Sequence, residues 1–202
     1  VFSTPTICEE NVEVIPKPLI VINEIRSTGT VEIKNTGTET IDVSELILCN
    51  FPAYTMIKDL NVICGSMMLE AGGILAVDNF DNFTAADGEM GIYRSQAFGN
   101  PDAIVDYVEW GASGHQRSSV AAEAGIWTEG SFVPAFGESE SIAYDGEGDT
   151  PSDWQVFSTP TICEENVEVI PKPLIVINEI RSTGTVEIKN TGTETIDVSE
   201  LI

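Results

Sequence analysis

Short apolar runs separated by turn signals dominate this chain. Residues 19–25 form a continuous run rich in Ile and Val, and residues 30–34 alternate, with Val31 and Ile33 on one face. Further strand-like runs are expected at residues 41–43, 46–49, 54–60, 62–64, 74–77, 92–93, 103–110, 141–144 and 154–157. Only residues 119–126 have the composition of a short helix. About nine or ten short strands, with turns spaced roughly 8–12 residues apart, predict an all-β sandwich or barrel.

The end of the chain repeats its beginning. Residues 156–202 are identical to residues 1–47 at every position, which gives an offset of 155 residues. A fixed period of this kind is typical of repeat proteins, in which each period is one structural unit. We therefore expect one β domain per period, with the chain covering one period and an overlap.

The order of several short motifs resembles the lamin-tail domain. The motifs are VINEI at residues 21–25, VEIKN at 31–35, IDVS at 41–44, LEAGG at 69–73, VDYVEW at 105–110 and a TP-to-Asn segment at 159–166. The lamin-tail domain is an Ig-like β-sandwich found at the end of nuclear lamins and in many secreted bacterial and archaeal proteins. The resemblance covers about residues 18–166 and implies an Ig-like β-sandwich, which the period of 155 residues would place in tandem repeat.

The resemblance also sets the expected boundaries. Residues 1–11 correspond to the C-terminal segment of a preceding repeat, residues 12–17 to a connector, and residues 18–166 to the sandwich. Residues 167–172 repeat the connector, and residues 173–202 begin the next repeat. The prolines of the connector favour a short, stiff link. Because residues 156–159 read as a last strand, their copy at residues 1–4 is an orphan strand that could add to the edge of another sheet.

The charge excludes several classes of partner. There are 33 acidic and 9 basic residues, a formal net charge of −24. Such a chain repels nucleic acids and anionic membrane surfaces, so we expect no nucleic-acid partner. No apolar stretch reaches the roughly 20 residues of a membrane span, so we expect no membrane insertion. The acidity either keeps the surface hydrated or serves to bind cations.

The cysteines favour an oxidising compartment. Cys8, Cys49 and Cys64 occur in one period, Cys163 repeats Cys8, and none forms a CxxC pair. Since Cys49 and Cys64 end successive apolar runs, we expect a disulfide between them, and an extracellular or cell-surface location. Buried reduced thiols are the alternative.

Two acidic segments are candidates for Ca²⁺, which prefers 6–8 oxygen ligands. In the first, YDGEGDTPSDW at residues 144–154, the candidate ligands alternate with glycines that let a loop wrap tightly. These candidates are Asp145, Glu147, Asp149 and Asp153. The second and weaker segment follows the run at residues 74–77 and contains Asp78, Asp81 and Asp87. The first segment does not have the spacing of an EF-hand, and a solvated turn is the alternative for it.

The remaining motifs are weak. Asn82 begins the chain's NFT sequon, which would be glycosylated only in a suitable secretory host. His115, the single histidine, lies in a Gly/Ser-rich segment and is expected at the surface. No nucleophile elbow, phosphate-binding loop or paired catalytic carboxylates stand out, so we expect no enzyme. The three tryptophans are expected in the core.

Three functions fit these features. The first is a structural repeat of an extracellular filament, stalk, surface layer or long adhesin, whose partners are neighbouring copies of itself. It would assemble through contacts between repeats or by strand addition. The second is a cell-surface module that binds a glycan or protein by avidity, and the third is an accessory domain of a secreted enzyme. Apart from Ca²⁺, no cofactor is expected.

Overall fold

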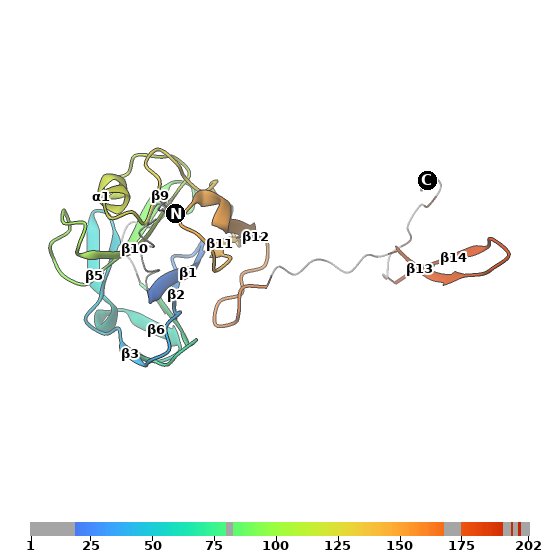
Figure 1. The fold of residues 1–202 in the computed structure, drawn as a ribbon, viewed down its shortest axis with the longest axis horizontal. Helices are drawn as coiled ribbons and strands as arrows, with labels where there is room; N and C mark the ends of the chain where they lie inside the picture. Colours follow the sequence, from blue (N-terminus) through green and yellow to red (C-terminus); the bar gives the residue numbers. More distant parts are fainter. Residues whose placement is uncertain (1–18, 80–82, 168–174, 192–194, 196–197, 199–202) are drawn as a thin grey trace, which may run out of the picture. The chain divides into compact units, whose positions relative to one another are not determined.

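The computed structural model describes residues 19–79, 83–167, 175–191, 195 and 198. The chain divides into two compact units, Val1–Val167 and Glu168–Ile202, which are described separately below (Figure 1). No helix among the described residues is long and apolar enough to cross a membrane.

The first unit is built from two main antiparallel sheets. The larger sheet runs in the order β12 (Trp154–Phe157), β11 (Ser141–Tyr144), β1 (Ile20–Arg26), β2 (Val31–Asn35), β8 (Ile74–Asp78) and β6 (Asn61–Cys64). The smaller sheet runs in the order β10 (Ile104–Trp110), β9 (Gly88–Tyr93), β4 (Ile47–Asn50) and β5 (Ala53–Met56). A short ladder joins β3 (Ile41–Asp42) and β7 (Met68–Leu69). The helical segments are η1 (Ile57–Asp59), α1 (Ser118–Glu123) and η2 (Pro151–Asp153).

One hydrophobic core joins the two sheets, and β1 packs against β9 and β10. A bulge in β1 sets which side chains face this core. The register with β2 shifts between Ile22 and Glu24, so Ile22 and Ile25 lie three residues apart and are both buried. The backbone N–H of Ile22 donates to Asp106 Oδ2 at 2.6 Å, which ties the larger sheet to β10. The unit is thus an all-β sandwich, and the predicted all-β class is confirmed.

The strands differ from the expected runs mainly at their ends. The run at residues 54–60 divides into β5 and η1, and β9 begins at Gly88, before the apolar pair at residues 92–93. Glycine is required at residue 88, because a Cβ there would lie 2.7 Å from Trp110 Cζ2. The helix α1 ends at Glu123, earlier than residue 126. All three tryptophans are buried, as expected.

The described part of the second unit is a hairpin of β13 (Ile175–Ile180) and β14 (Val186–Asn190). It has the sequence and register of β1–β2, and the same bulge lies between Ile177 and Glu179. Its burial is different. Ile22 and Ile25 are 0% exposed, whereas their counterparts Ile177 and Ile180 are 64% and 68% exposed. The local sequence therefore specifies the hairpin, and the rest of a sandwich is what buries it.

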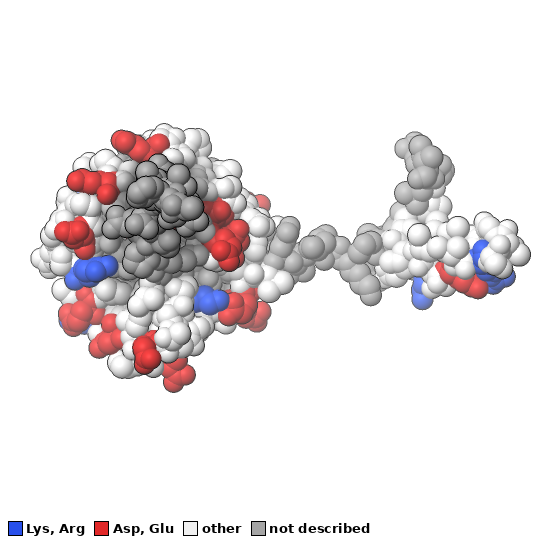
Figure 2. All heavy atoms as spheres, in the orientation of Figure 1, with Lys and Arg blue, Asp and Glu red and all other residues white. Residues whose placement is uncertain are grey.

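Acidic side chains are spread over the visible face of the first unit, with few basic side chains among them (Figure 2). Their spread agrees with a hydrated acidic surface, and the basic side chains of the described residues visible in this view form no patch.

Candidate functional site

The first candidate site is on the outer face of β1 and β2, where residues 159–166 lie across the sheet. We call these residues the closing segment. The bulge in β1 that turns Ile22 and Ile25 inward also places Glu24 on the outward face, opposite Glu32 of β2. Both carboxyl groups are nevertheless 0% exposed. A buried carboxyl group needs hydrogen-bond donors, and the closing segment supplies them.

Glu24 binds the first half of the closing segment. The backbone N–H of Thr161 donates to Glu24 Oε1 at 2.9 Å, and the Thr161 hydroxyl donates to Oε2 at 2.7 Å. Ser141 on β11 donates its hydroxyl to Oε1 at 2.5 Å. Glu24 therefore joins the closing segment to the sheet.

Glu32 binds the middle of the closing segment. The backbone N–H of Cys163 donates to Glu32 Oε2 at 2.5 Å, and the Asn23 amide donates to Oε1 at 2.6 Å. Burial raises the pKa of Glu32 to about 7, although the hydrogen bonds from Cys163 and Asn23 act in the opposite direction. The nearby charge of Glu24 adds to the rise. Glu32 is thus a buried carboxyl group that titrates near neutrality.

The end of the closing segment is held by polar side chains. The Asn166 amide donates to the carbonyl oxygens of Asn23 and Tyr144, both at 2.8 Å. Lys34 on β2 forms an ion pair with Glu165 at 2.5 Å. These contacts fix the segment up to the last residue before the predicted connector.

A disulfide between Cys64 and Cys163 fastens the closing segment to the end of β6. The predicted Cys49–Cys64 pairing is therefore wrong. Cys49 is a buried free cysteine on β4, in the smaller sheet, whereas Cys64 is on β6 at the edge of the larger sheet. Burial raises the pKa of the Cys49 thiol to about 12, which makes it a poor nucleophile. The expectation of a disulfide is confirmed, but with a different partner.

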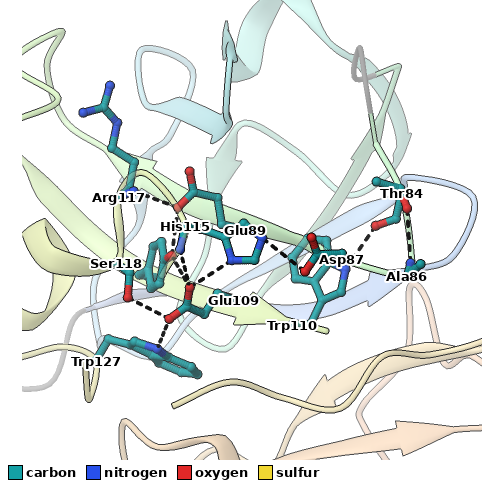
Figure 3. Close-up of polar contacts among 11 residues, drawn as sticks. Thr84, Ala86, Asp87, Glu89, Glu109, Trp110, His115, Arg117, Ser118 and Trp127 are labelled. Carbon is teal, nitrogen blue, oxygen red and sulfur yellow. Dashed lines mark hydrogen bonds and ion pairs between the residues drawn. The ribbon is translucent and has the colours of Figure 1, made fainter. Parts of the chain in front are cut away.

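The second candidate site is a buried polar network around Glu109 on β10 (Figure 3). Glu109 is 0% exposed and accepts hydrogen bonds from three side chains that follow it in the chain. Ser118 Oγ lies 2.7 Å from Oε1, Trp127 Nε1 lies 3.2 Å from Oε1, and His115 Nδ1 lies 3.0 Å from Oε2. The His115 backbone N–H also donates to Oε2 at 3.1 Å. Glu109 thereby fixes the path of the chain from β10 through α1.

Glu89 on β9 extends this network. It accepts a hydrogen bond from the Tyr107 hydroxyl at 2.8 Å and one from the Arg117 backbone N–H at 2.9 Å, both at Oε2. Burial raises the pKa of Glu89 and that of Tyr107. Its Oε1 is buried without a hydrogen-bond partner. Glu89 and Glu109 together hold the loop before α1 against the smaller sheet.

His115 is not the surface residue that its Gly/Ser-rich surroundings suggested. Its side chain is 19% exposed, and its Nε2 lies 3.4 Å from Asp87 Oδ1 (Figure 3). The arrangement differs from a catalytic triad, because Ser118 donates to Glu109 rather than to the imidazole. The contacts of His115 and Ser118 are those of a structural network.

The first predicted calcium segment forms a compact turn in which two carboxyl groups bind their own loop. Asp145 Oδ1 accepts the N–H of Glu147 at 2.8 Å, and Asp153 Oδ2 accepts the N–H of Thr150 at 2.7 Å. Asp149 contributes to raising the pKa of Tyr144, whose largest cause is burial. These geometries are those of turns and a capping box.

The weaker calcium segment is dispersed. Asp78 accepts a hydrogen bond from the Asn61 amide at 2.9 Å, and Asp87 faces His115. Asp81 and the sequon residue Asn82 lie outside the described residues. Among the residues that are described, no group of three or more His, Cys, Asp or Glu side chains is arranged to hold a metal ion. Calcium binding stays a prediction, which melting curves with and without a chelator would test.

Comparisons with protein-family models, with curated proteins and with solved structures found no match. The resemblance to the lamin-tail domain therefore rests on the motifs alone. Sequence reasoning missed the Glu109 network, since glutamates in a strand pattern normally indicate an exposed face. The TP-to-Asn motif did point to residues 159–166, but the outward carboxyl groups that bind this segment became visible only in the structure.

Proposed function

We propose that this chain is part of an extracellular or cell-surface structural array, built from lamin-tail-like, Ig-like sandwiches in tandem. In such an array the function lies in the assembly, as in a filament, stalk, surface layer or long adhesin. Each period of 155 residues supplies one sandwich and one connector, and the partners of each unit are its neighbours.

The observation that carries this proposal is the exposed hairpin β13–β14. Its apolar face repeats side chains that are wholly buried in the first unit, such as Ile33, whose counterpart Ile188 is 45% exposed. An isolated two-stranded hairpin is only marginally stable in water. Burying this one requires the counterparts of the strands that follow β2. The hairpin therefore supports a second sandwich of the same kind.

Three further observations support the proposal. The surface disulfide between Cys64 and Cys163 suits an oxidising compartment, which agrees with an extracellular or cell-surface location. Three of the motifs shared with the lamin-tail domain lie on β1 and β2, in the middle of the larger sheet, and on β10 of the smaller sheet. The high acidic charge suits an assembly that must stay hydrated.

Hydrogen exchange followed by mass spectrometry tests the hairpin argument. Residues 20–35 and 175–190 yield the same peptide, so one digest reports both copies in a single spectrum. In this chain we expect two isotope envelopes, one protected and one exchanged. In a chain extended after residue 202 with residues 48–166, the envelopes should merge into one protected envelope. Two envelopes in the extended chain would contradict the proposal.

The array itself is tested by the size of the natural protein. We expect an intact mass that grows in steps of one period, and extended particles in electron micrographs. A natural protein with a single period and no self-association would exclude a structural array.

A second candidate, a glycan-binding module, is favoured by one cavity. A hollow of about 410 Å³ lies beside the end of the closing segment, and most of the residues that line it have polar side chains. It is lined by residues that include Asn23, Asn35, Tyr144 and Asp145, which offer hydrogen-bonding groups and one aromatic ring. A glycan array tests it. Binding that is lost in Asp145→Ala but kept in Asp102→Ala, at an exposed position elsewhere, would favour this function.

A further inference from the structure

The sandwich has one site for a closing segment, but the chain has two copies of that segment. We call the site the closing groove and define it by Asn23, Glu24, Glu32, Lys34 and Cys64. Residues 4–11 are identical to the closing segment, residues 159–166. Every closing-segment residue that contacts the groove has its counterpart in the N-terminal copy. The counterparts of Thr161, Cys163, Glu165 and Asn166 are Thr6, Cys8, Glu10 and Asn11.

We propose that residues 4–11 and residues 159–166 are interchangeable occupants of the closing groove, and that Cys8 replaces Cys163 as the disulfide partner of Cys64 when they exchange. Residues 4–11 lie outside the described part of the chain, so the proposal rests on their sequence and on the contacts of the described copy. The same donors would reach Glu24 and Glu32, and the same thiol would reach β6.

The connection to β1 is long enough for this exchange within one chain. Asn166 bonds to the carbonyl oxygen of Asn23, and Leu19 lies four residues earlier, about 13 Å along an extended strand. If Asn11 took the position of Asn166, eight residue steps would join it to Leu19. These steps span up to about 26–29 Å when extended. The chain is therefore long enough for residues 4–11 to reach the closing groove of their own sandwich.

The resident segment has one advantage over its copy. It follows directly from β12, whose first residue, Trp154, is buried against Tyr144. Trp154 lies just before the repeated sequence and has no counterpart in the N-terminal copy. We therefore expect residues 159–166 to occupy the groove in most molecules and residues 4–11 in a minority.

The disulfide can follow the exchange without an external oxidant. The Cys8 thiolate attacks Cys64 Sγ, the Cys8–Cys64 bond forms as the Cys64–Cys163 bond breaks, and the electron pair leaves on Cys163 Sγ. Cys163 then takes up the proton that Cys8 lost. The attacked sulfur belongs to Cys64, which is only partly buried, and its partner Cys163 is exposed, so a thiol can approach the disulfide. Cys49 is buried with a raised pKa and does not compete.

In an array, this exchange would couple neighbouring units, a consequence that rests on the proposed repeat function. Every sandwich would lie between two copies of the closing segment, the one that ends the preceding unit and its own. When each sandwich is closed by the segment at its own C-terminal end, the units are independent. When a sandwich is closed by the segment of the preceding unit, its own segment is free to bind the next sandwich. The occupant of one groove therefore influences the occupant of the next. The array would thus have two states, one with each groove filled by the same unit's segment and one with it filled by the preceding unit's segment. Thiol–disulfide exchange would interconvert them.

Tryptic mapping of the whole chain tests the proposal. Cys8, Cys64 and Cys163 fall in three different tryptic peptides, residues 1–26, 59–94 and 118–181. After incubation in a glutathione redox buffer and alkylation, we expect a minor Cys8–Cys64 species in which Cys163 is alkylated. In Cys163→Ser, refolded with oxidised glutathione, we expect Cys8–Cys64 to become the main linkage. Dilution by about tenfold should leave its yield unchanged, because closure is intramolecular.

A shifted cysteine provides the matched control. In the Cys163→Ser background, Cys8→Ser combined with Glu10→Cys moves the thiol by two residues along the same segment. Specific docking predicts that this variant loses most of the linkage to Cys64, whereas random pairing predicts an equal yield. An equal yield, a yield that falls with dilution, or a Cys64 that pairs only with glutathione would each overturn the proposal. If Cys163→Ser does not fold, the redox mapping of the unmodified chain still decides. Failure here would leave the hydrogen-exchange test of the repeat untouched.

Discussion

The two copies of one isoleucine offer a matched test of the structure. Ile22 and Ile177 have the same neighbours in sequence and the same place in a β hairpin, but they are 0% and 64% exposed. Replacing Ile22 by Ala removes three buried carbon atoms, which costs about 2.4 kcal/mol at about 0.8 kcal/mol each, and leaves a cavity between the sheets. With the cost of the cavity included, we expect Ile22→Ala to lower the free energy of unfolding by about 3–4 kcal/mol. For Ile177→Ala we expect less than about 0.5 kcal/mol.

Urea unfolding followed by tryptophan fluorescence separates the two cases. All three tryptophans are in the first unit, so the signal reports its unfolding alone. Ile22→Ala should lower the midpoint with little change in slope, and Ile177→Ala should leave both unchanged. Any loss of strand propensity is common to both variants and cancels in the comparison. Equal shifts of the midpoint would refute the reasoning, since they would mean that the second hairpin is buried in the same cooperative unit.

Three further predictions concern groups in the first unit. Glu109→Gln should destabilise the first unit by about 3 kcal/mol or more, because the new amide hydrogens face buried hydrogen-bond donors. The exposed control Glu129→Gln should change the stability by less than about 0.5 kcal/mol. Equal effects of the two substitutions would contradict the buried network. The pKa of Glu32 rises from 4.5 to about 7 on folding, so its contribution to stability is full below pH 4.5 and is lost as pH rises through 7. The loss amounts to up to about 3 kcal/mol of unfolding free energy. Urea unfolding at a series of pH values should show this decrease in the unmodified chain and not in Glu32→Gln. Gly88→Ala should lower the free energy of unfolding by about 1–3 kcal/mol, because the new Cβ clashes with Trp110. The control is Gly99→Ala, where a Cβ meets nothing within 4 Å. Thermal melts should show a lower melting temperature for the first variant and little change for the second.

The sequence predicted the strands well because short β-branched runs and turn residues are local signals. It placed β1, β2, β8, β11 and β12 within a residue or two of where they lie. Local signals could not identify the partners in the disulfide. Cys64 and Cys163 are 99 residues apart in sequence, and which ends of strands meet depends on the order of strands in the sheet. Local patterns contain no information on that order.

The buried glutamates illustrate a second limit. Glu24 and Glu32 occupy polar positions of alternating strands, a pattern that normally indicates contact with water. In this chain the pattern indicates a face that water does not reach, because the closing segment covers it with N–H and hydroxyl donors. Similarly, Glu109 is polar within a buried strand because it must bind the loop that follows. Burial of a polar side chain is decided by distant residues, which a local pattern does not reveal.

These glutamates also determine which stretch of the chain makes one stable unit. A sandwich that ended at β12 would leave the two carboxyl groups without the donors of Thr161 and Cys163, and Cys64 without its partner. A unit that includes residues 159–166 satisfies all three, and the compact first unit does extend through the segment to Val167. The outward carboxyl groups are therefore the reason that the segment is part of the fold rather than part of the connector. The same groups, repeated at Glu179 and Glu187, would require a closing segment for the second hairpin as well.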